Sequence, residues 1–147
     1  MKMRSGFVAP NTSIHYYVVE FDPAKLSWAD FRAKMLGPTD PKDAPDGALR
    51  GTIFKDWKAL GLAAEPNVGD NGVHASASPF ESLAERMNWL KADVEKDGFA
   101  QRLVKAGVPI ATIKAWSVDP QVKGASLFDQ LEDLDATACV AKAASLV

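Results

Sequence analysis

The sequence has a single cysteine and no long apolar run, and each shortage excludes a class of protein. Cys139 alone cannot form an internal disulfide or a cysteine-based metal cluster, so we expect a small buried side chain there. No stretch is long and apolar enough to span a membrane, and the first residues lack the apolar segment of a signal peptide. We therefore expect a cytoplasmic protein without membrane partners.

The chain also lacks a charge excess of either sign. It has 17 basic and 19 acidic side chains and a net charge of −2, so we expect no nucleic-acid partner. A nucleotide would need only a local basic pocket. The apolar fraction of 47% is typical of a folded chain, and the length of 147 residues predicts a single domain over 1–147.

Metal-ligating patterns are sparse as well. His15 and His74 are the two histidines, and they are too far apart in the sequence to form a zinc signature. Asp40, Asp43 and Asp46 are evenly spaced but lack the closing glutamate of a calcium loop, so they are interpreted as a solvated acidic turn. The sequence predicts no metal held by protein side chains.

What the chain does contain is one histidine in an unusual setting. His74 follows a turn around Asn71-Gly72 and precedes Ser76, Ser78 and Pro79, which are typical of a helix start. Val73 to Ala75 is predicted as a short strand and the following helix extends to about Asp97. A helix N-terminus attracts anions, and a neutral imidazole there can attack phosphorus. The alternative is an ordinary polar histidine beside two capping serines.

The rest of the chain predicts one clear strand and several helices. The strand is Ser13–Phe21, which is rich in aromatic and β-branched residues. The apolar spacing predicts helices over 27–36, 53–60, 99–106, 108–116, 127–134 and 136–146.

A loop over 37–51, rich in proline and glycine, is long enough to indicate a functional segment. Arg50 offers a planar fork for phosphate oxygens and Thr39 a hydroxyl. Arg32, on the preceding helix, is either solvated or turned toward a phosphate.

Two motifs together resemble the nucleoside diphosphate kinase family. The first is Leu36-Gly-Pro-Thr-Asp-Pro followed by Gly47-Ala-Leu-Arg-Gly51, and the second is Asn71-x-x-His74-x-Ser76-x-Ser78. The resemblance covers about 17–90, with an apparent insertion over 54–68.

The resemblance implies an α+β fold: a partial ferredoxin-like α/β sandwich over 13–97, with additional C-terminal helices over 98–147. It implies ping-pong transfer of a γ-phosphate from nucleoside triphosphates to diphosphates, with Mg²⁺ accompanying the nucleotide. His74 would be the phosphohistidine. Thr39, Arg50 and Asn71 would contact phosphate or ribose, and Ser76 would support the site.

The sequence departs from the family in ways that leave other functions open. The N-terminal Lys-Pro-Asp-Gly segment and its βαβ unit are absent, Ala33 stands in place of an arginine, and Ala77 in place of an acid. Glu85 would orient His74 in the family, but helical phase puts it opposite Leu83 and favours a solvated glutamate. The alternatives are a catalytically impaired nucleotide-binding protein and an interaction scaffold.

The missing unit also has a consequence for assembly. An isolated second unit leaves strand edges and apolar faces open. Either the C-terminal helices cover them, or two chains complete one sheet. We therefore expect a homodimer or higher oligomer, or one part of a larger complex.

Overall fold

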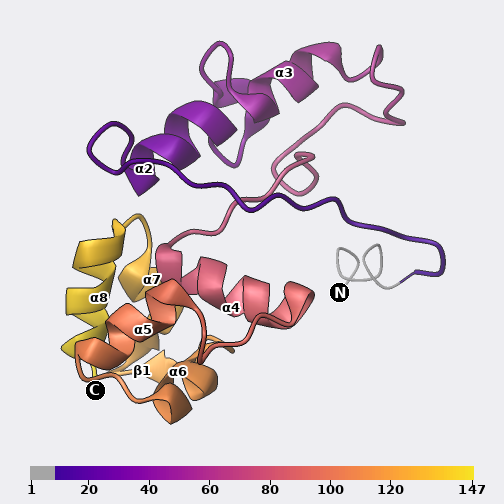
Figure 1. Ribbon diagram of the computed structural model, residues 1–147. Helices are drawn as coiled ribbons and strands as arrows, with labels where there is room; N and C mark the ends of the chain where they lie inside the picture. Colours follow the sequence, from indigo (N-terminus) through magenta and orange to yellow (C-terminus); the bar gives the residue numbers. More distant parts are fainter. Residues whose placement is uncertain (1–8) are drawn as a thin grey trace.

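The computed structural model (Figure 1) describes residues 9–147 as a set of short helices with one small hairpin. None of the helices in this part of the chain is long and apolar enough to cross a membrane. The elements in chain order are α2 (Trp28–Asp30), the π-helix η1 (Phe31–Leu36), the 3₁₀-helix η2 (Pro41–Asp43), α3 (Leu49–Asp56), α4 (Pro79–Leu90), α5 (Gly98–Lys105), α6 (Ile110–Trp116), β1 (Gln121–Val122), β2 (Ala125–Ser126), α7 (Leu127–Leu131) and α8 (Ala136–Ala144).

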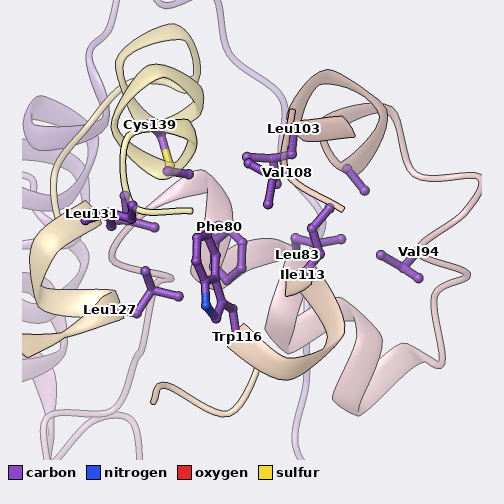
Figure 2. Close-up of a cluster of buried hydrophobic side chains, with 13 residues drawn as sticks. Phe80, Leu83, Val94, Leu103, Val108, Ile113, Trp116, Leu127, Leu131 and Cys139 are labelled. Carbon is purple, nitrogen blue, oxygen red and sulfur yellow. The ribbon is translucent and has the colours of Figure 1, made fainter. Parts of the chain in front are cut away.

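The hydrophobic core lies among helices α4 to α8, which gather in one half of the molecule (Figure 1). Phe80 lies at its centre beside Trp116 (Figure 2), and its ring is in edge-to-face contact with those of Trp116 and Phe128. Cys139 is buried as expected, and burial raises the pKa of its thiol to about 11. The cluster contains residues from both sides of position 97, where the sequence predicts the boundary between the 13–97 core and the C-terminal helices. Its members are Phe80, Leu83, Val94, Ala100, Leu103, Val108, Ile113, Trp116, Leu127, Leu131, Cys139, Ala143 and Leu146.

Helix α4 begins where the sequence predicts. The Ser78 hydroxyl accepts a hydrogen bond from the Glu81 amide, and Pro79 occupies the first turn. Its end was predicted wrongly, because the helix stops at Leu90 instead of continuing to about Asp97. Lys91 adopts a left-handed conformation, with φ of 57°, and its amide caps the Arg86 carbonyl. The apolar residues keep a helical spacing as far as Val94, although the helix has already ended at Leu90.

Asp97 begins α5 and ties it to α4. Its carboxylate accepts hydrogen bonds from the amides of Phe99 and Ala100 and forms an ion pair with Arg86. Burial raises the pKa of Asp97, but the hydrogen bonds from Arg86 and the two amides outweigh burial and hold the pKa below its ordinary value. Asp97 therefore stabilises the fold above its unfolded-state pKa, and this contribution is lost as pH falls through the lowered pKa.

Replacing Asp97 with alanine should lower the free energy of unfolding at neutral pH by about 2 kcal/mol, because a helix cap and the partner of Arg86 are lost together. Urea unfolding at pH 7 and at pH 3 measures this. The difference between wild type and variant should shrink as pH falls, because the carboxylate is protonated first in the unfolded state and the contribution is lost on approach to the lowered pKa of the folded state. Equal stability of the two proteins at pH 7 would contradict the role of Asp97.

The strands differ from the prediction more than the helices do. Among residues 9–147 the strands are β1 and β2, which pair antiparallel through a turn at Lys123 and Gly124. Both turn residues have positive φ, of 50° and 90°. This is the conformation in which a two-residue turn matches the twist of the two strands it joins. The predicted strand Ser13–Phe21 is stretched out (Figure 1) but pairs with no other described segment, and Val73–Ala75 is likewise not a strand. The ferredoxin-like sandwich therefore stays a prediction.

The predicted helix over 53–60 is shifted, since α3 spans Leu49–Asp56. Helix α2 is one of the elements that join the N-terminal segments to the rest of the molecule. Phe21 stacks on Phe31 at 5.1 Å between ring centroids, and it also contacts Trp28 at 5.4 Å. The Trp28 amide donates to Asp135 Oδ1 at 2.7 Å, next to the first residue of α8. The last of these contacts holds α2 against the start of α8.

Candidate functional site

His74 lies on the loop that leads into α4. Its side chain is 66% exposed, and its Nε2 lies 2.5 Å from Glu85 Oε1. Glu85 is on α4, and its second oxygen, Oε2, accepts a hydrogen bond from the Ser76 hydroxyl at 2.5 Å. One carboxylate therefore orients both the imidazole and the serine.

The expectation of a solvated Glu85 is wrong. Its side chain is 30% exposed and contacts His74 as well as Ser76. Helical phase alone placed Glu85 away from the apolar face of α4, and this is correct. The loop over 73–77 folds back along that same polar face, which a helical projection cannot reveal. Burial raises the pKa of Glu85, but hydrogen bonds from His74 and Ser76 outweigh burial and hold the pKa below its ordinary value.

The Glu85 hydrogen bond also sets the state of the imidazole. It raises the pKa of His74 above its ordinary value, more than burial lowers it. In the neutral ring the carboxylate selects the tautomer that carries its proton on Nε2. The Nδ1 lone pair is then free, and Nδ1 forms no hydrogen bond to the described residues. The nitrogen that can act as a nucleophile is therefore Nδ1.

Glu81 is a further member of the site that the sequence interpretation missed. Its Oε2 accepts a hydrogen bond from the Ala77 amide, and burial raises the pKa of the carboxyl group. Glu81 and Glu85 are four residues apart on one helix, so they lie on the same face. That spacing was the available signal, but it points to His74 only once the loop is placed.

Arg50 holds the loop instead of standing free. Its Nε and Nη2 donate to the Val73 carbonyl, at 3.3 and 2.9 Å, and its Nη1 donates to the Gly37 carbonyl at 2.9 Å. Three of the five guanidinium N–H groups are thus used, and two remain for a ligand. Gly37 has φ of 96°, and a Cβ there would lie 3.1 Å from that of Ala44. The tight turn at Gly37 brings its carbonyl to Arg50.

The other predicted binding residues are near one another but differ in setting. Asn71 Nδ2 donates to the Thr39 carbonyl at 3.1 Å, which ties the two motifs together and leaves the exposed Thr39 hydroxyl at the surface. Arg32 is held by two carboxylates instead of being solvated. Its Nη1 pairs with Asp133 Oδ1 at 2.5 Å and with Glu132 Oε1 at 2.8 Å, between α7 and α8.

Two hydrogen bonds fix the backbone beside the site. Trp28 Nε1 donates to the Ser76 carbonyl at 2.9 Å, and the Asp133 amide donates to the Ala77 carbonyl at 2.9 Å. The loop before α4 is therefore held from the N-terminal side and from the C-terminal helices together.

Comparison with known proteins supports one relationship. A nucleoside diphosphate kinase from Pyrobaculum aerophilum is 42% identical over 60 residues, which is 41% of this chain and 32% of the relative. The chain is distantly similar to nucleoside diphosphate kinases. It spans about a third of the length of that relative. No family model matches the sequence, and no solved structure matches it.

Proposed function

We propose that the chain is a divergent nucleoside diphosphate kinase-like phosphotransferase with His74 as the phosphate carrier. The observation that supports this most strongly is the Glu85 carboxylate, which binds His74 Nε2 and Ser76 Oγ together and leaves Nδ1 unbonded within the described residues. The nucleotide substrates enter with Mg²⁺ on their phosphates, where the ion offsets negative charge.

In the first half-reaction, the lone pair of Nδ1 attacks the γ-phosphorus of a nucleoside triphosphate. The N–P bond forms as the bridging P–O bond breaks, and the nucleoside diphosphate leaves with that electron pair. In the second, a terminal β-phosphate oxygen of an acceptor diphosphate attacks the same phosphorus and the N–P bond breaks. The phosphorylated ring is more positive than the free one, so the Glu85 carboxylate stabilises it through Nε2–H.

Arg50 has two roles in this proposal. Its hydrogen bonds to the Val73 carbonyl hold Val73 in place, directly before His74 in the chain. Its two remaining N–H groups are available for phosphate oxygens. Thr39 and Asn71 are joined by a hydrogen bond and are proposed to contact the nucleotide through the Thr39 hydroxyl and the free groups of the Asn71 amide.

A nucleotide-binding protein without turnover is the second candidate. It is favoured by the pairing of Arg32 with two acidic residues and by the engagement of Arg50 with two carbonyls, which leave few free cations near His74. The test is formation of GTP from ATP and GDP over a grid of both concentrations, with His74→Ala alongside. Parallel double-reciprocal lines, lost in the variant, support the transferase. Nucleotide binding without GTP formation supports the second candidate.

We further propose that a second copy of the chain pairs with the extended segment Ser13–Phe21. Apolar side chains are exposed on both faces of this segment, with Tyr17 86% and Val18 64% exposed, and its backbone pairs with no described strand. Antiparallel pairing about a two-fold axis at Val18 would set Tyr17 opposite Val19 of the second copy, an aromatic and β-branched combination that stabilises sheets.

Light scattering after size exclusion should give the mass of a dimer for the wild type, and Val18→Lys should convert it to the monomer. Val118→Lys is the matched control, because Val118 is 80% exposed but lies outside the segment. A monomeric wild type, or equal masses for the two variants, would contradict pairing through Ser13–Phe21.

A further inference from the structure

The side chains of His74, Glu81 and Glu85 converge although they come from two different segments. One ligand atom from each lies within 4.8 Å of the other two. The two glutamates are contributed by one face of α4 and the histidine by the loop before it. The proposed phosphoryl transfer uses His74 and Glu85, but it gives Glu81 no role.

We propose that these three side chains bind one Zn²⁺ ion and that the bound ion blocks His74 as a nucleophile. The second half of this proposal rests on the proposed function, whereas the first half does not. One imidazole nitrogen and two carboxylate oxygens are typical zinc ligands, and three protein ligands leave a fourth position for water. Tetrahedral zinc separates its ligand atoms by about 3.3 Å, so modest side-chain rotations suffice.

The combination of one nitrogen and two oxygen ligands favours Zn²⁺ over the other common divalent ions. Mg²⁺ and Ca²⁺ prefer oxygen ligands and gain little from an imidazole. Zn²⁺ binds imidazole and carboxylate together and exceeds Mg²⁺ in affinity for such a set. The site would therefore discriminate against the Mg²⁺ that accompanies a nucleotide.

The surroundings of the three ligands leave room for an ion. Glu81 Oε1 has no hydrogen-bond partner among the described residues, while Oε2 is bonded to the Ala77 amide. A hollow of about 430 Å³ borders both glutamates, so water can reach their carboxylates. Arg50 and Arg32 are the cations that act on the cluster from the other elements, and both are held by other partners, Arg50 by carbonyls and Arg32 by carboxylates.

Zinc changes the tautomer of the imidazole. The Zn–N bond forms with the lone pair of Nε2, which faces Glu85, and the proton leaves Nε2. In the neutral ring this proton moves through solvent to Nδ1, so the lone pair that attacks phosphorus is no longer available. Zn²⁺ and the phosphoryl group therefore exclude each other at His74.

The test is titration of the full-length chain with Zn²⁺ by calorimetry, repeated with Co²⁺ by visible absorption. Wild type should bind one ion, and Co²⁺ should give the absorption of a four-coordinate nitrogen and oxygen site. Glu81→Gln keeps the acceptor for the Ala77 amide but should weaken binding at least about 10- to 100-fold. Glu65→Gln, at an exposed site, and His15→Ala are the matched controls, and both should bind as wild type does.

The two proposals fail separately. If His74 is phosphorylated, micromolar Zn²⁺ should stop labelling of wild type but not of Glu81→Gln. If His74 is never phosphorylated, the kinase proposal fails while the titrations still decide the metal site. No Zn²⁺ binding by wild type, or equal affinity in wild type and Glu81→Gln, would overturn the site. Equal inhibition of phosphate labelling by Zn²⁺ in wild type and Glu81→Gln would contradict the proposal that zinc bound at this site blocks His74.

Discussion

Replacing Glu85 with glutamine is expected to slow phosphoryl transfer by about 10²- to 10⁴-fold, the range seen when the carboxylate that orients a catalytic imidazole is lost. An amide in this position can offer its NH₂ group to Nε2, which favours the tautomer that carries the proton on Nδ1. It also cannot neutralise the charge that develops on the phosphorylated ring. The effect should appear in kcat, because Glu85 is bonded to His74 and Ser76 and has no contact assigned to the nucleotide.

The same variant should change the pH dependence. The neutral imidazole is the nucleophile, so transfer falls as pH drops through the pKa of His74. Glu85 raises this pKa above its ordinary value, so wild-type activity should fall at a higher pH than that of an unperturbed histidine. In Glu85→Gln the acid limb of the pH–rate profile should move to lower pH. Glu81→Gln, measured without zinc, is the control for lost charge and should keep most of the rate. An unchanged rate and acid limb in Glu85→Gln would remove Glu85 from the mechanism.

Replacing Phe80 with alanine is expected to lower the free energy of unfolding by about 3–5 kcal/mol. Phe80 is fully buried at the centre of the core (Figure 2) and contacts the rings of both Trp116 and Phe128. The variant loses the buried area of the ring and leaves a cavity between α4, α6 and α7. Urea unfolding followed by circular dichroism measures the change.

Trp89→Ala is the matched control for Phe80→Ala, because it removes a larger ring from the same helix. Trp89 is 56% exposed, so its loss should cost about 1 kcal/mol or less. Equal costs for the two variants would contradict a core centred on Phe80. Since Phe80 lies in the first turn of α4, its loss should also reduce transfer, because the same helix carries Glu85.

Local signals in the sequence predicted the start of α4 well. Ser78 and Pro79 act on their own neighbours, so the helix start can be read without knowledge of the fold. The end of α4 depends on Lys91, which adopts a conformation that glycine or asparagine usually adopts at a helix end. Nothing in the residue type signals that stop.

Most members of the site were predictable from the sequence, but Glu81 and the geometry were not. His74, Ser76 and Arg50 follow from motif spacing, yet the contact of Glu85 with His74 depends on how the loop over 73–77 folds back. Arg32 pairs with Asp133, a hundred residues further along the chain, and no local pattern indicates such a pair. The strand Ser13–Phe21 has strand-forming residues, but a strand needs a partner, and the described chain offers none.

Phosphate transfer onto His74 is the most direct measurement of the central proposal. The purified chain is incubated with Mg²⁺ and γ-labelled ATP, quenched in base, and digested to locate the label, with His74→Ala and Glu85→Gln in parallel. We expect an acid-labile label on the peptide that contains His74, absent in His74→Ala and discharged by added GDP. No label on wild type at saturating ATP, or label of equal amount on His74→Ala, would contradict the proposed phosphotransferase.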